Sequence, residues 1–345
     1  MSFLKNTGKA LADVIPGLGK FTFDPTLGKI FVTSGTGVIG YRVAYSLLEA
    51  GHKDVRVGVW KGDRQVGPDG DDFVSGVAKV LEDKGAEIVE FDWENEDGYA
   101  DALHGVKTIF CSIPRIKDYA KKFPVFLQAA KDKKIEHFVK ISFLRKGDAG
   151  KMYRERVPFC DFQASCDDIL EHARYDSRIS YTILCASHLM STPLMQQGKL
   201  LRQEKKFVTA SYGMGVNYVS PNDVADAAMV VLLDLAPHRN KVYNLSGPGP
   251  TKDKEIAKLL SEAYGEPIEH IELGYHDYKA SVIERGLPEW MAQDAADLER
   301  MKAMGIDEDR SLYDKTLAKL TGRKPETFKE YLANKSCMRP GATFP

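Results

Sequence analysis

Three glycines near the start of the chain have the spacing of a phosphate-binding loop. Gly35, Gly37 and Gly40 form G-x-G-x-x-G within the sequence SGTGVIG. In such a loop the first glycine permits a tight turn, the second lets the backbone approach a pyrophosphate, and the third lets helix and strand pack closely. The residues that we predict to hold the phosphates are Gly35, Thr36, Gly37, Val38, Ile39 and Gly40. The alternative is a glycine-rich turn that only connects two elements.

The segments on either side of these glycines favour a dinucleotide as the ligand. The apolar run at 30–32 predicts a buried strand before them, and apolar residues at helical spacing from 38 to 48 predict a helix after them. This order presents the free N–H groups and the positive dipole end of the helix to a dinucleotide pyrophosphate. A P-loop is excluded, because Tyr41 and Arg42 follow Gly40 in place of Lys-Ser/Thr.

Basic residues follow the next predicted strand, which ends at Trp60. In NAD-specific sites an acidic residue at this strand end binds the ribose 2′-hydroxyl. Here Lys61 and Arg64 follow, and both side chains suit a ribose 2′-phosphate. We therefore expect NADP(H) in preference to NAD(H), although Asp63 lies between the two cations. The alternative for Lys61 and Arg64 is a solvated surface loop.

Two further strand ends carry candidate cofactor contacts. Asp92 and Trp93 end the third predicted strand, where the carboxylate is expected to accept a hydrogen bond from the adenine amino group with the indole beside the ring. The alternative is a helix-capping aspartate and a packing tryptophan. Ser112 and Pro114 follow the fourth strand, and we expect this segment to pass beneath the nicotinamide side of the cofactor.

Ser142 and His188 are the candidate catalytic residues. Ser142 ends the fifth predicted strand, so it is placed for a hydrogen bond to substrate or nicotinamide, with a strand-end cap as the alternative. His188 follows the sixth strand, and a histidine there is able to donate a proton after hydride transfer. Its alternative role is packing at a junction between two lobes. The basic segment 145–156 is expected to form a solvated, mobile lid, or else to attract an acidic substrate or partner.

Strands and helices alternate through the first half of the chain. Strands are predicted at 30–32, 54–60, 87–91, 107–111, 137–141 and 181–184, and helices at 38–48, 72–84, 97–103, 119–133 and 162–174. A helix at 223–233 and a strand at 242–245 follow, and then helices near 253–264, 275–285, 291–303 and 311–320. The alternation predicts an α/β fold, with a doubly wound parallel-sheet Rossmann domain and a smaller, mostly helical C-terminal lobe.

The domain boundaries follow from these elements. We expect an N-terminal arm at 1–28, an NAD(P)-binding domain made of 29–185 and 217–246, a substrate or partner lobe made of 186–216 and 247–335, and a tail at 336–345. The alternative for the arm is a docking segment, or one that is exchanged between the subunits of a homodimer.

Composition excludes several classes of protein. The 345 residues, 43% of them apolar, are enough for a large core, and 48 Lys and Arg against 49 Asp and Glu provide no excess charge for nucleic acid. No apolar run approaches the roughly 20 residues that span a bilayer. Five cysteines without a C-x-x-C pair are typical of reduced thiols, which predicts a cytoplasmic or other reducing location. No His/Cys cluster has zinc spacing, so no metal is expected.

Seven segments occur in an order that is known from other proteins. They are VTSGTGVIG, the strand-end pair Asp92-Trp93, AKDKKIEHFVKIS, ISYTILCASHLM, VSPNDVADAAMVVL, KVYNLSGPGP and the closing LTGRKPETFKEYL. Over about residues 29–335 the chain resembles the NmrA-like family of atypical short-chain dehydrogenases/reductases. The resemblance implies a Rossmann domain, a smaller C-terminal lobe and NADP(H) in the groove. Known members include quinone reductases, reductases of plant phenolics, and redox-sensing regulators with little or no turnover.

The chain departs from the family pattern at two places. Ser34 begins a glycine segment that many members write G-A-T-G-x-x-G, which is tolerable if its backbone does not need a positive φ. The reductases of this broad group also use Tyr-x-x-x-Lys, in which the lysine lowers the tyrosine pKa for proton transfer. Here Val157 stands four residues after Tyr153, and the helix that often carries the lysine reads FQAS at 162–165.

Three functions therefore remain open from the sequence. The first is an NADPH-dependent oxidoreductase that acts on a small molecule, a quinone or a conjugated carbonyl compound, since such an acceptor takes hydride and then a solvent proton. The second is a catalytically weak or silent NADPH/NADP sensor that regulates a protein partner. The third is a scaffold subunit that retains the fold.

Overall fold

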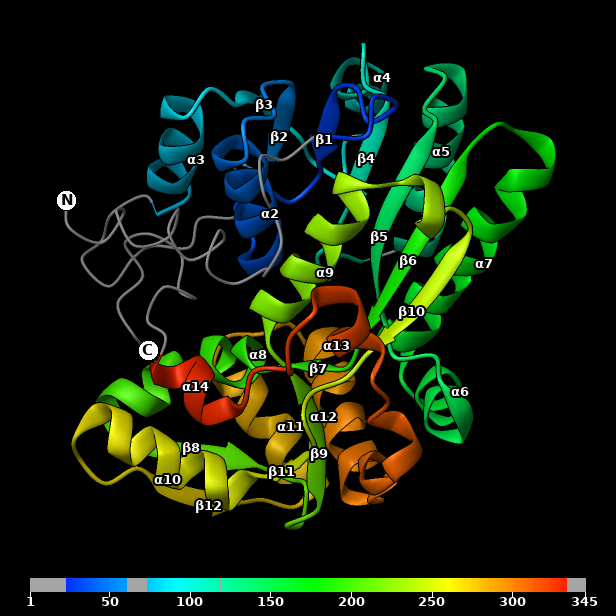
Figure 1. Cartoon of the computed structure of the whole chain (residues 1–345). Coiled ribbons are helices and arrows are strands. Elements are labelled where there is room, and N and C mark those ends of the chain that lie inside the picture. Colours follow the sequence, from blue (N-terminus) through cyan, green and yellow to red (C-terminus); the bar gives the residue numbers. More distant parts are fainter. Residues whose placement is uncertain (1–22, 61–72, 118, 334–345) are drawn as a thin grey trace.

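The computed structural model describes residues 23–60, 73–117 and 119–333, in which a large parallel sheet stands above a smaller lobe (Figure 1). The strands of the large sheet are β1 (Ile30–Val32), β2 (Val55–Val59), β3 (Glu87–Glu90), β4 (Thr108–Cys111), β5 (His137–Phe143), β6 (Ser180–Ala186) and β10 (Lys241–Leu245). Their order in the sheet is β10-β6-β5-β4-β1-β2-β3, and all neighbours are parallel. The order reverses between β1 and β4, and ligands of such sheets bind at the strand ends beside this point.

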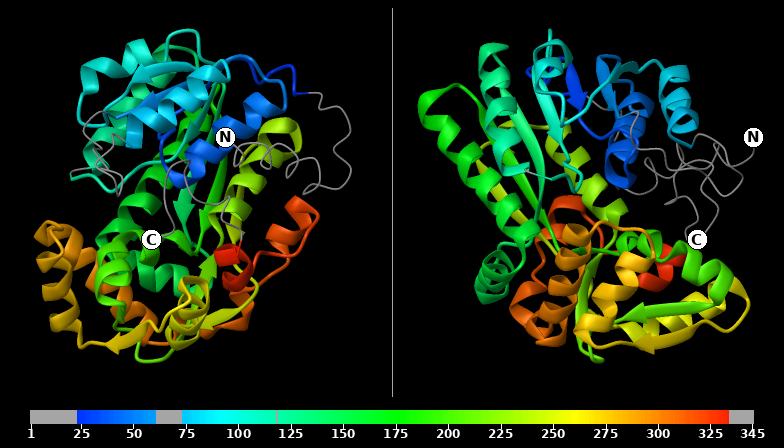
Figure 2. Two further views of the ribbon diagram at one scale, coloured as in Figure 1. Left: turned by 90° about the vertical axis from the view of Figure 1, so that its left-hand side faces the viewer. Right: turned by 180° about the vertical axis from the view of Figure 1, so that it is seen from behind.

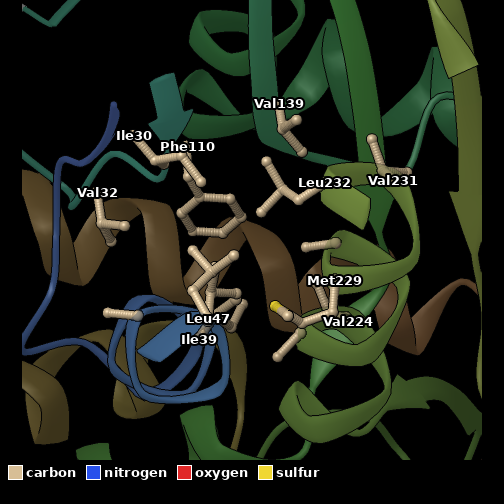
Figure 3. Close-up of a cluster of buried hydrophobic side chains, with 14 of the residues drawn as sticks. Ile30, Val32, Ile39, Leu47, Phe110, Val139, Val224, Met229, Val231 and Leu232 are labelled. Atoms are coloured by element: carbon tan, nitrogen blue, oxygen red, sulfur yellow. The ribbon is translucent and has the colours of Figure 1, made fainter. Parts of the chain in front are cut away.

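Alternate side chains of the strands build one core on each face of the sheet. Ile30 and Val32 of β1 belong to the cluster beneath α2 and α9, whereas Phe31 belongs to the opposite one. Figure 3 shows the first cluster, where Phe110 and Val139 of the sheet meet Leu47 of α2 and Leu232 of α9. Figure 2 shows the other face from behind, with α5 and α7 across it. Both faces are covered, which explains the near-continuous apolar strands.

The helices divide between the two faces. The first face carries α2 (Val38–Glu49), α3 (Phe73–Asp83), α9 (Pro221–Leu233) and α13 (Thr316–Thr321). The second carries η1 (Glu96–Gly98), α4 (Tyr99–Ala102), α5 (Tyr119–Asp132) and α7 (Pro158–Asp176), with α6 (Gly147–Arg156) beside α7 and η3 (Ala236–His238) before β10.

The lobe is built from the segments that connect and follow the last strands of the sheet. It contains two small sheets, made of β7 (His188–Leu189), β9 (Gly215–Val219) and β11 (Pro250–Lys252), and of β8 (Lys206–Thr209) and β12 (Glu269–Glu272). Its helical segments are α8 (Ser191–Gln196), η2 (Leu200–Glu204), α10 (Asp253–Tyr264), α11 (Tyr275–Glu284), α12 (Glu289–Ala303), η4 (Ile306–Glu308), η5 (Arg310–Leu312) and α14 (Phe328–Ala333). In the described residues, no helix is both long and apolar enough to cross a membrane.

The fold class predicted from the alternation is confirmed, two local predictions are wrong, and one set of strands was not predicted. The basic segment 145–156 is not a solvated loop, because residues 147–156 form helix α6 and most of its cations are paired: Arg145 with Glu171, for example, at 2.7 Å. The helix expected at 311–320 is broken into η5 and the shorter α13, because Asp309 caps a 3-10 turn through the Ser311 N–H. The short strands of the lobe were not predicted, because each is too brief to show a two-residue period.

A buried charge cluster attaches the C-terminal segment to the sheet domain. Arg323, from the most family-specific segment, contacts Asp223 of α9 at 2.5 Å and Asp226 at 2.6 Å. Asp226 also pairs with Arg42 of α2 at 3.1 Å. Both aspartates are almost inaccessible, and burial raises the pKa of Asp223 to about 6 in spite of Arg323. The cluster therefore joins the C-terminal segment, α9 and α2.

We predict that Arg323→Met lowers the free energy of unfolding by about 3 kcal/mol, because it leaves buried carboxylates with one cation fewer. Urea unfolding at pH 7 measures the change. Arg310→Met is the control, since Arg310 is exposed and its loss is expected to change the stability by less than about 0.5 kcal/mol. Equal effects of the two substitutions would contradict the role of the cluster.

His137, on β5, makes stability depend on pH. The ring is fully buried, with Nδ1 at 2.7 Å from Ser180 Oγ and Nε2 at 3.1 Å from Thr182 Oγ1. Burial, with the nearby Arg239, lowers its pKa from 6.5 to about 3. Between these values the unfolded chain binds a proton that the folded protein does not, so stability falls as the pH falls below 6.5.

We predict that His137→Gln removes this part of the acid sensitivity. The difference in unfolding free energy between wild type and variant should shrink by about 1.4 kcal/mol per pH unit below pH 6. Urea unfolding at pH 7, 6, 5 and 4 measures it, and a difference that does not change with pH would show that His137 is not held neutral.

Candidate active site

The glycine turn is held by close contacts that leave no room for side chains. A Cβ atom on Gly35 would lie 1.9 Å from Val57 Cγ1 of β2, and one on Gly40 would lie 2.0 Å from the Ser34 carbonyl oxygen. Neither glycine has a positive φ. Glycine is therefore required at these two positions by close packing, of the turn against β2 at Gly35 and of α2 against the turn at Gly40. A left-handed backbone is not the reason.

Gly37 differs from the other two because its surroundings are open. A Cβ atom here would meet nothing closer than the Ser34 carbonyl oxygen at 3.3 Å. Gly37 is the N-cap of α2, no side chain caps this helix, and its first turn contains no acidic residue. The N–H groups of that turn are thus left for an anion, and the missing side chain leaves the space that an anion needs. The turn fits a dinucleotide pyrophosphate.

Two hydroxyl groups attach the turn to the neighbouring strand. Thr33 Oγ1 and Ser34 Oγ both donate to the carbonyl oxygen of Ser112, at 2.8 and 2.6 Å, and the Ser112 N–H donates back to Thr33 Oγ1. Ser34 does not have a positive φ, so serine is tolerated where many family members have glycine. These bonds join the turn after β1 to the end of β4, and β1 and β4 are the two strands between which the strand order reverses.

We predict that Gly37→Asp folds normally and binds NADPH at least 100-fold more weakly, because it places a side chain and a negative charge where the pyrophosphate lies. Fluorescence titration with NADPH and thermal unfolding measure the two properties. Gly249→Asp is the matched control, since a Cβ atom at Gly249 meets nothing within 4 Å. If Gly37→Asp binds NADPH as tightly as wild type, the phosphate site is misplaced.

A cavity adjoins the turn, with walls from both the sheet and the lobe. It encloses about 1110 Å³, counting open solvent at its mouth. The sheet side includes Ile39, Ser112 and Ser142, and the lobe side includes His188 of β7; all four are predicted site residues. Side chains of α8, α11 and α12 close the lobe side. The arrangement places a ligand at the strand ends and covers it with the C-terminal lobe.

Ser142 is bonded to a buried ion pair behind the cavity wall. Its Oγ donates to Asp167 Oδ2 at 2.5 Å, and Lys140 Nζ lies 2.8 Å from Asp167 Oδ1 and 2.8 Å from Gln163 Oε1. Burial raises the pKa of Asp167, and Lys140 acts against this shift. We regard the pair as ionised, because the carboxylate accepts bonds from both Lys140 and Ser142. The Ser142 proton is therefore engaged, and its oxygen is left to accept a hydrogen bond from a ligand.

His188 meets a tyrosine and an aspartate on the side away from the cavity. Its Nε2 lies 2.8 Å from the Tyr153 hydroxyl and 3.4 Å from Asp307 Oδ2, and the Tyr153 hydroxyl is 3.0 Å from the same Asp307 oxygen. If Tyr153 donates to the carboxylate, His188 Nε2–H donates to Tyr153, and Nδ1 is left for a ligand. Burial lowers the pKa of His188, although Asp307 raises it, and burial raises the pKa of Tyr153 well above its usual value.

A second lysine and tyrosine meet in the lobe wall of the cavity. Lys302 Nζ of α12 is 2.6 Å from Glu299 Oε1 and 3.4 Å from the Tyr218 hydroxyl. Glu299 Oε2 also accepts the Ala210 N–H at 2.9 Å, so its charge is well satisfied. Burial raises the pKa of Tyr218 well above its usual value in spite of Lys302. This pair does not provide a tyrosine that ionises near neutral pH.

Comparison with known families agrees with this arrangement. The family model described as the NmrA-like family matches residues 26–332. The chain belongs to the NmrA-like family. Quinone oxidoreductase 2 of Escherichia coli K12 is 24% identical over 313 residues, covering 88% of this chain and 98% of that protein. The NAD(P)H azoreductase of Xenophilus azovorans is 24% identical over 254 residues, covering 74% of this chain and 84% of that protein.

Solved structures show the same fold. The E. coli NADPH-dependent quinone oxidoreductase complexed with NADPH has a TM-score of 0.68 at 23% identity, over 88% of this chain and 98% of that one. The Citrobacter triphenylmethane reductase complexed with NADP(H) has a TM-score of 0.67 at 23% identity, over 88% and 99%. At these identities the likeness concerns the fold alone.

Within this NmrA-like fold, the remaining predicted cofactor residues have different surroundings. Trp93 is 3% exposed and packs against Phe126 at 4.7 Å between ring centroids, as in the packing alternative. Asp92 Oδ1 accepts the Glu94 N–H at 2.8 Å within a local turn, and the N-cap of the helix that follows is Asn95. Pro114 is exposed and outside the cavity wall. The predicted phosphate ligands Lys61 and Arg64 lie outside the described residues.

Several functional residues were missed by sequence reasoning. Lys140 carried a signal, because a lysine inside an otherwise apolar strand needs a buried partner. Tyr153 was considered only as part of a Tyr-x-x-x-Lys motif, and its link to His188 depends on the fold. Arg115 and Lys302 gave no sequence signal. Among the described residues, no cluster of histidine, cysteine or acidic side chains suits a metal, and the four described cysteines are buried thiols.

Proposed function

We propose that this NmrA-like protein is an NADPH-dependent oxidoreductase that reduces a quinone or another conjugated carbonyl compound. The observation that carries the proposal is the cavity: it connects the open N-terminus of α2 with the lobe, and its walls include no tyrosine poised to give up a proton. NADPH is preferred to NADH on the basis of the cations at 61 and 64, and solved relatives that contain NADPH or NADP(H) support this preference.

When bound, the cofactor supplies hydride. The chain's own part is to hold the two reactants together. The α2 N-terminus binds the pyrophosphate, and the Ser112 segment, attached to the turn by Thr33 and Ser34, supports the nicotinamide side. Ser142 Oγ is available to accept a hydrogen bond from the carboxamide N–H of the nicotinamide. The lobe covers the cavity and limits the access of water to the acceptor.

The state of the proton donors favours a quinone over a simple ketone. Reduction adds one hydride and one proton, and a simple ketone requires the proton as the hydride arrives. Tyr153 and Tyr218 hold their protons strongly, and burial keeps His188 neutral near pH 7. A reduced quinone spreads its negative charge over the ring and takes its proton from water afterwards. The site therefore suits an acceptor that needs no strong acid.

We predict steady oxidation of NADPH in the presence of 2-methyl-1,4-naphthoquinone, slower turnover with an enal such as cinnamaldehyde, and none with a simple ketone such as cyclohexanone. Loss of absorbance at 340 nm measures the rate, with Gly37→Asp as the control that should abolish it. His188→Gln should leave quinone kcat largely unchanged, because a general acid is not required. A 100-fold fall in quinone kcat would instead assign His188 the proton transfer.

The same assay distinguishes a second function, a nucleotide sensor. The specific observation in its favour is the burial of Lys140 against Asp167, which leaves the lysine unable to activate a tyrosine in the cavity. Tight NADPH binding without turnover on any acceptor, together with a partner or oligomer change between NADPH and NADP, would support the sensor over the oxidoreductase.

A further inference from the structure

One cation in the cavity wall forms no ion pair with any carboxylate of the described residues. Arg115 follows the Ser112–Pro114 segment at the end of β4 and lines the cavity. Its Nη1 atom is buried and has no hydrogen-bond partner among the described residues, and none of their carboxylates lies within the 4.0 Å of an ion pair. A buried guanidinium N–H without an acceptor is costly. Such a group needs an acceptor that the chain itself does not supply.

The other charges of the cavity wall are balanced. Glu299 and Lys302 neutralise each other at 2.6 Å. Asp294 of α12 acts on Arg115 only through space, and one of its oxygens accepts the Phe159 N–H at 3.3 Å. Asp294 therefore offsets the charge of Arg115 only in part, and an anionic ligand group in the cavity would supply the acceptor that Arg115 Nη1 lacks.

The surroundings of Arg115 indicate a substrate rather than the cofactor. Its guanidinium carbon lies 4.7 Å from the centre of the Phe159 ring, at the start of α7, and Leu298 of α12 lines the same cavity. These neighbours come from the lobe side and from α7, whereas the pyrophosphate site is at Gly37. Stacking on Phe159 holds the guanidinium plane, and a planar fork of N–H donors matches a carboxylate. The apolar neighbours suit an aromatic or conjugated ring.

We propose that Arg115 is a specificity-determining residue that binds the carboxylate of a conjugated acceptor, so that the natural substrate is an acidic quinone or enone. This inference rests on the proposed oxidoreductase function for its chemistry. The binding of a carboxylate beside Phe159 does not depend on turnover, which allows the two to be tested separately.

The test uses ligand pairs that differ only in charge. Calorimetry measures the binding of 2-naphthoate and of methyl 2-naphthoate to the protein saturated with NADP. Steady-state kinetics compares 3-(1,4-naphthoquinon-2-yl)propanoate with its methyl ester. Wild type should bind the acid at least tenfold more tightly than the ester, and KM should differ in the same direction. Arg115→Leu should remove the preference for the acid while the ester and NADPH bind as in wild type.

Two further variants separate the site from general effects. Arg115→Lys keeps the positive charge but lacks the planar fork of N–H donors, so it should retain part of the preference for the acid over the ester. Arg154→Gln removes a partly exposed cation of α6, which is paired with Asp161 outside the cavity wall, and should retain all of the preference.

Three results would each overturn the proposal. They are the absence of a preference for the acid in wild type, an equal loss of acid and ester binding in a folded Arg115→Leu, and weaker NADPH binding by that variant. Arg115-dependent naphthoate binding without any quinone turnover would support the carboxylate site and refute the oxidoreductase function. Quinone turnover without a preference for the acid would support the oxidoreductase function and refute the carboxylate site.

Discussion

The close approach of helix α2 to the end of strand β1 is the constraint on which the site depends. The helix starts so near the strand that a Cβ atom on Gly40 would stand 2.0 Å from the Ser34 carbonyl oxygen. This approach brings an uncapped helix N-terminus to the place where the sheet order reverses. The ion pair between Arg42 of α2 and Asp226 of α9 joins these two helices. Arg323 of the C-terminal segment pairs with the same aspartate. One charge cluster thus connects the helix that starts at the glycine turn with the C-terminal segment.

Around this turn the fold places most charged groups in pairs, and one cation of the cavity wall, Arg115, forms no ion pair within the described residues. Lys140 and Asp167 are both fully buried and satisfy each other behind Ser142, and Lys302 is neutralised by Glu299. Such pairs keep the wall rigid at the expense of reactivity, because each lysine is held by a carboxylate rather than by a tyrosine. Arg115 differs in that stacking on Phe159 holds it in place without neutralising it. The site is therefore better prepared to bind and align an acceptor than to protonate it.

Sequence reasoning succeeded where the signal was local. The apolar strands, the amphipathic helices and the glycine turn follow from residues within a few positions of one another, and the fold class followed from their alternation. It left two roles open for Trp93, because a strand-end tryptophan has the same local sequence whether it faces a ligand or packs against Phe126. It failed for segment 145–156, where a run of cations resembled a solvated loop. Their carboxylate partners, such as Glu171 and Asp314, lie on other elements.

By itself the sequence determined most elements of the large sheet and its helices, the family and the glycine turn, because periodicity and the absence of side chains act over short distances along the chain. Only the tertiary structure decided which polar groups meet in the cavity wall. Lys140 and Asp167 are 27 residues apart, and Tyr153 and Asp307 are 154 apart. No local pattern encodes such pairs, since each depends on how whole helices are placed against the sheet. The same holds for Arg115, whose lack of a partner is visible only when all of its neighbours are in position.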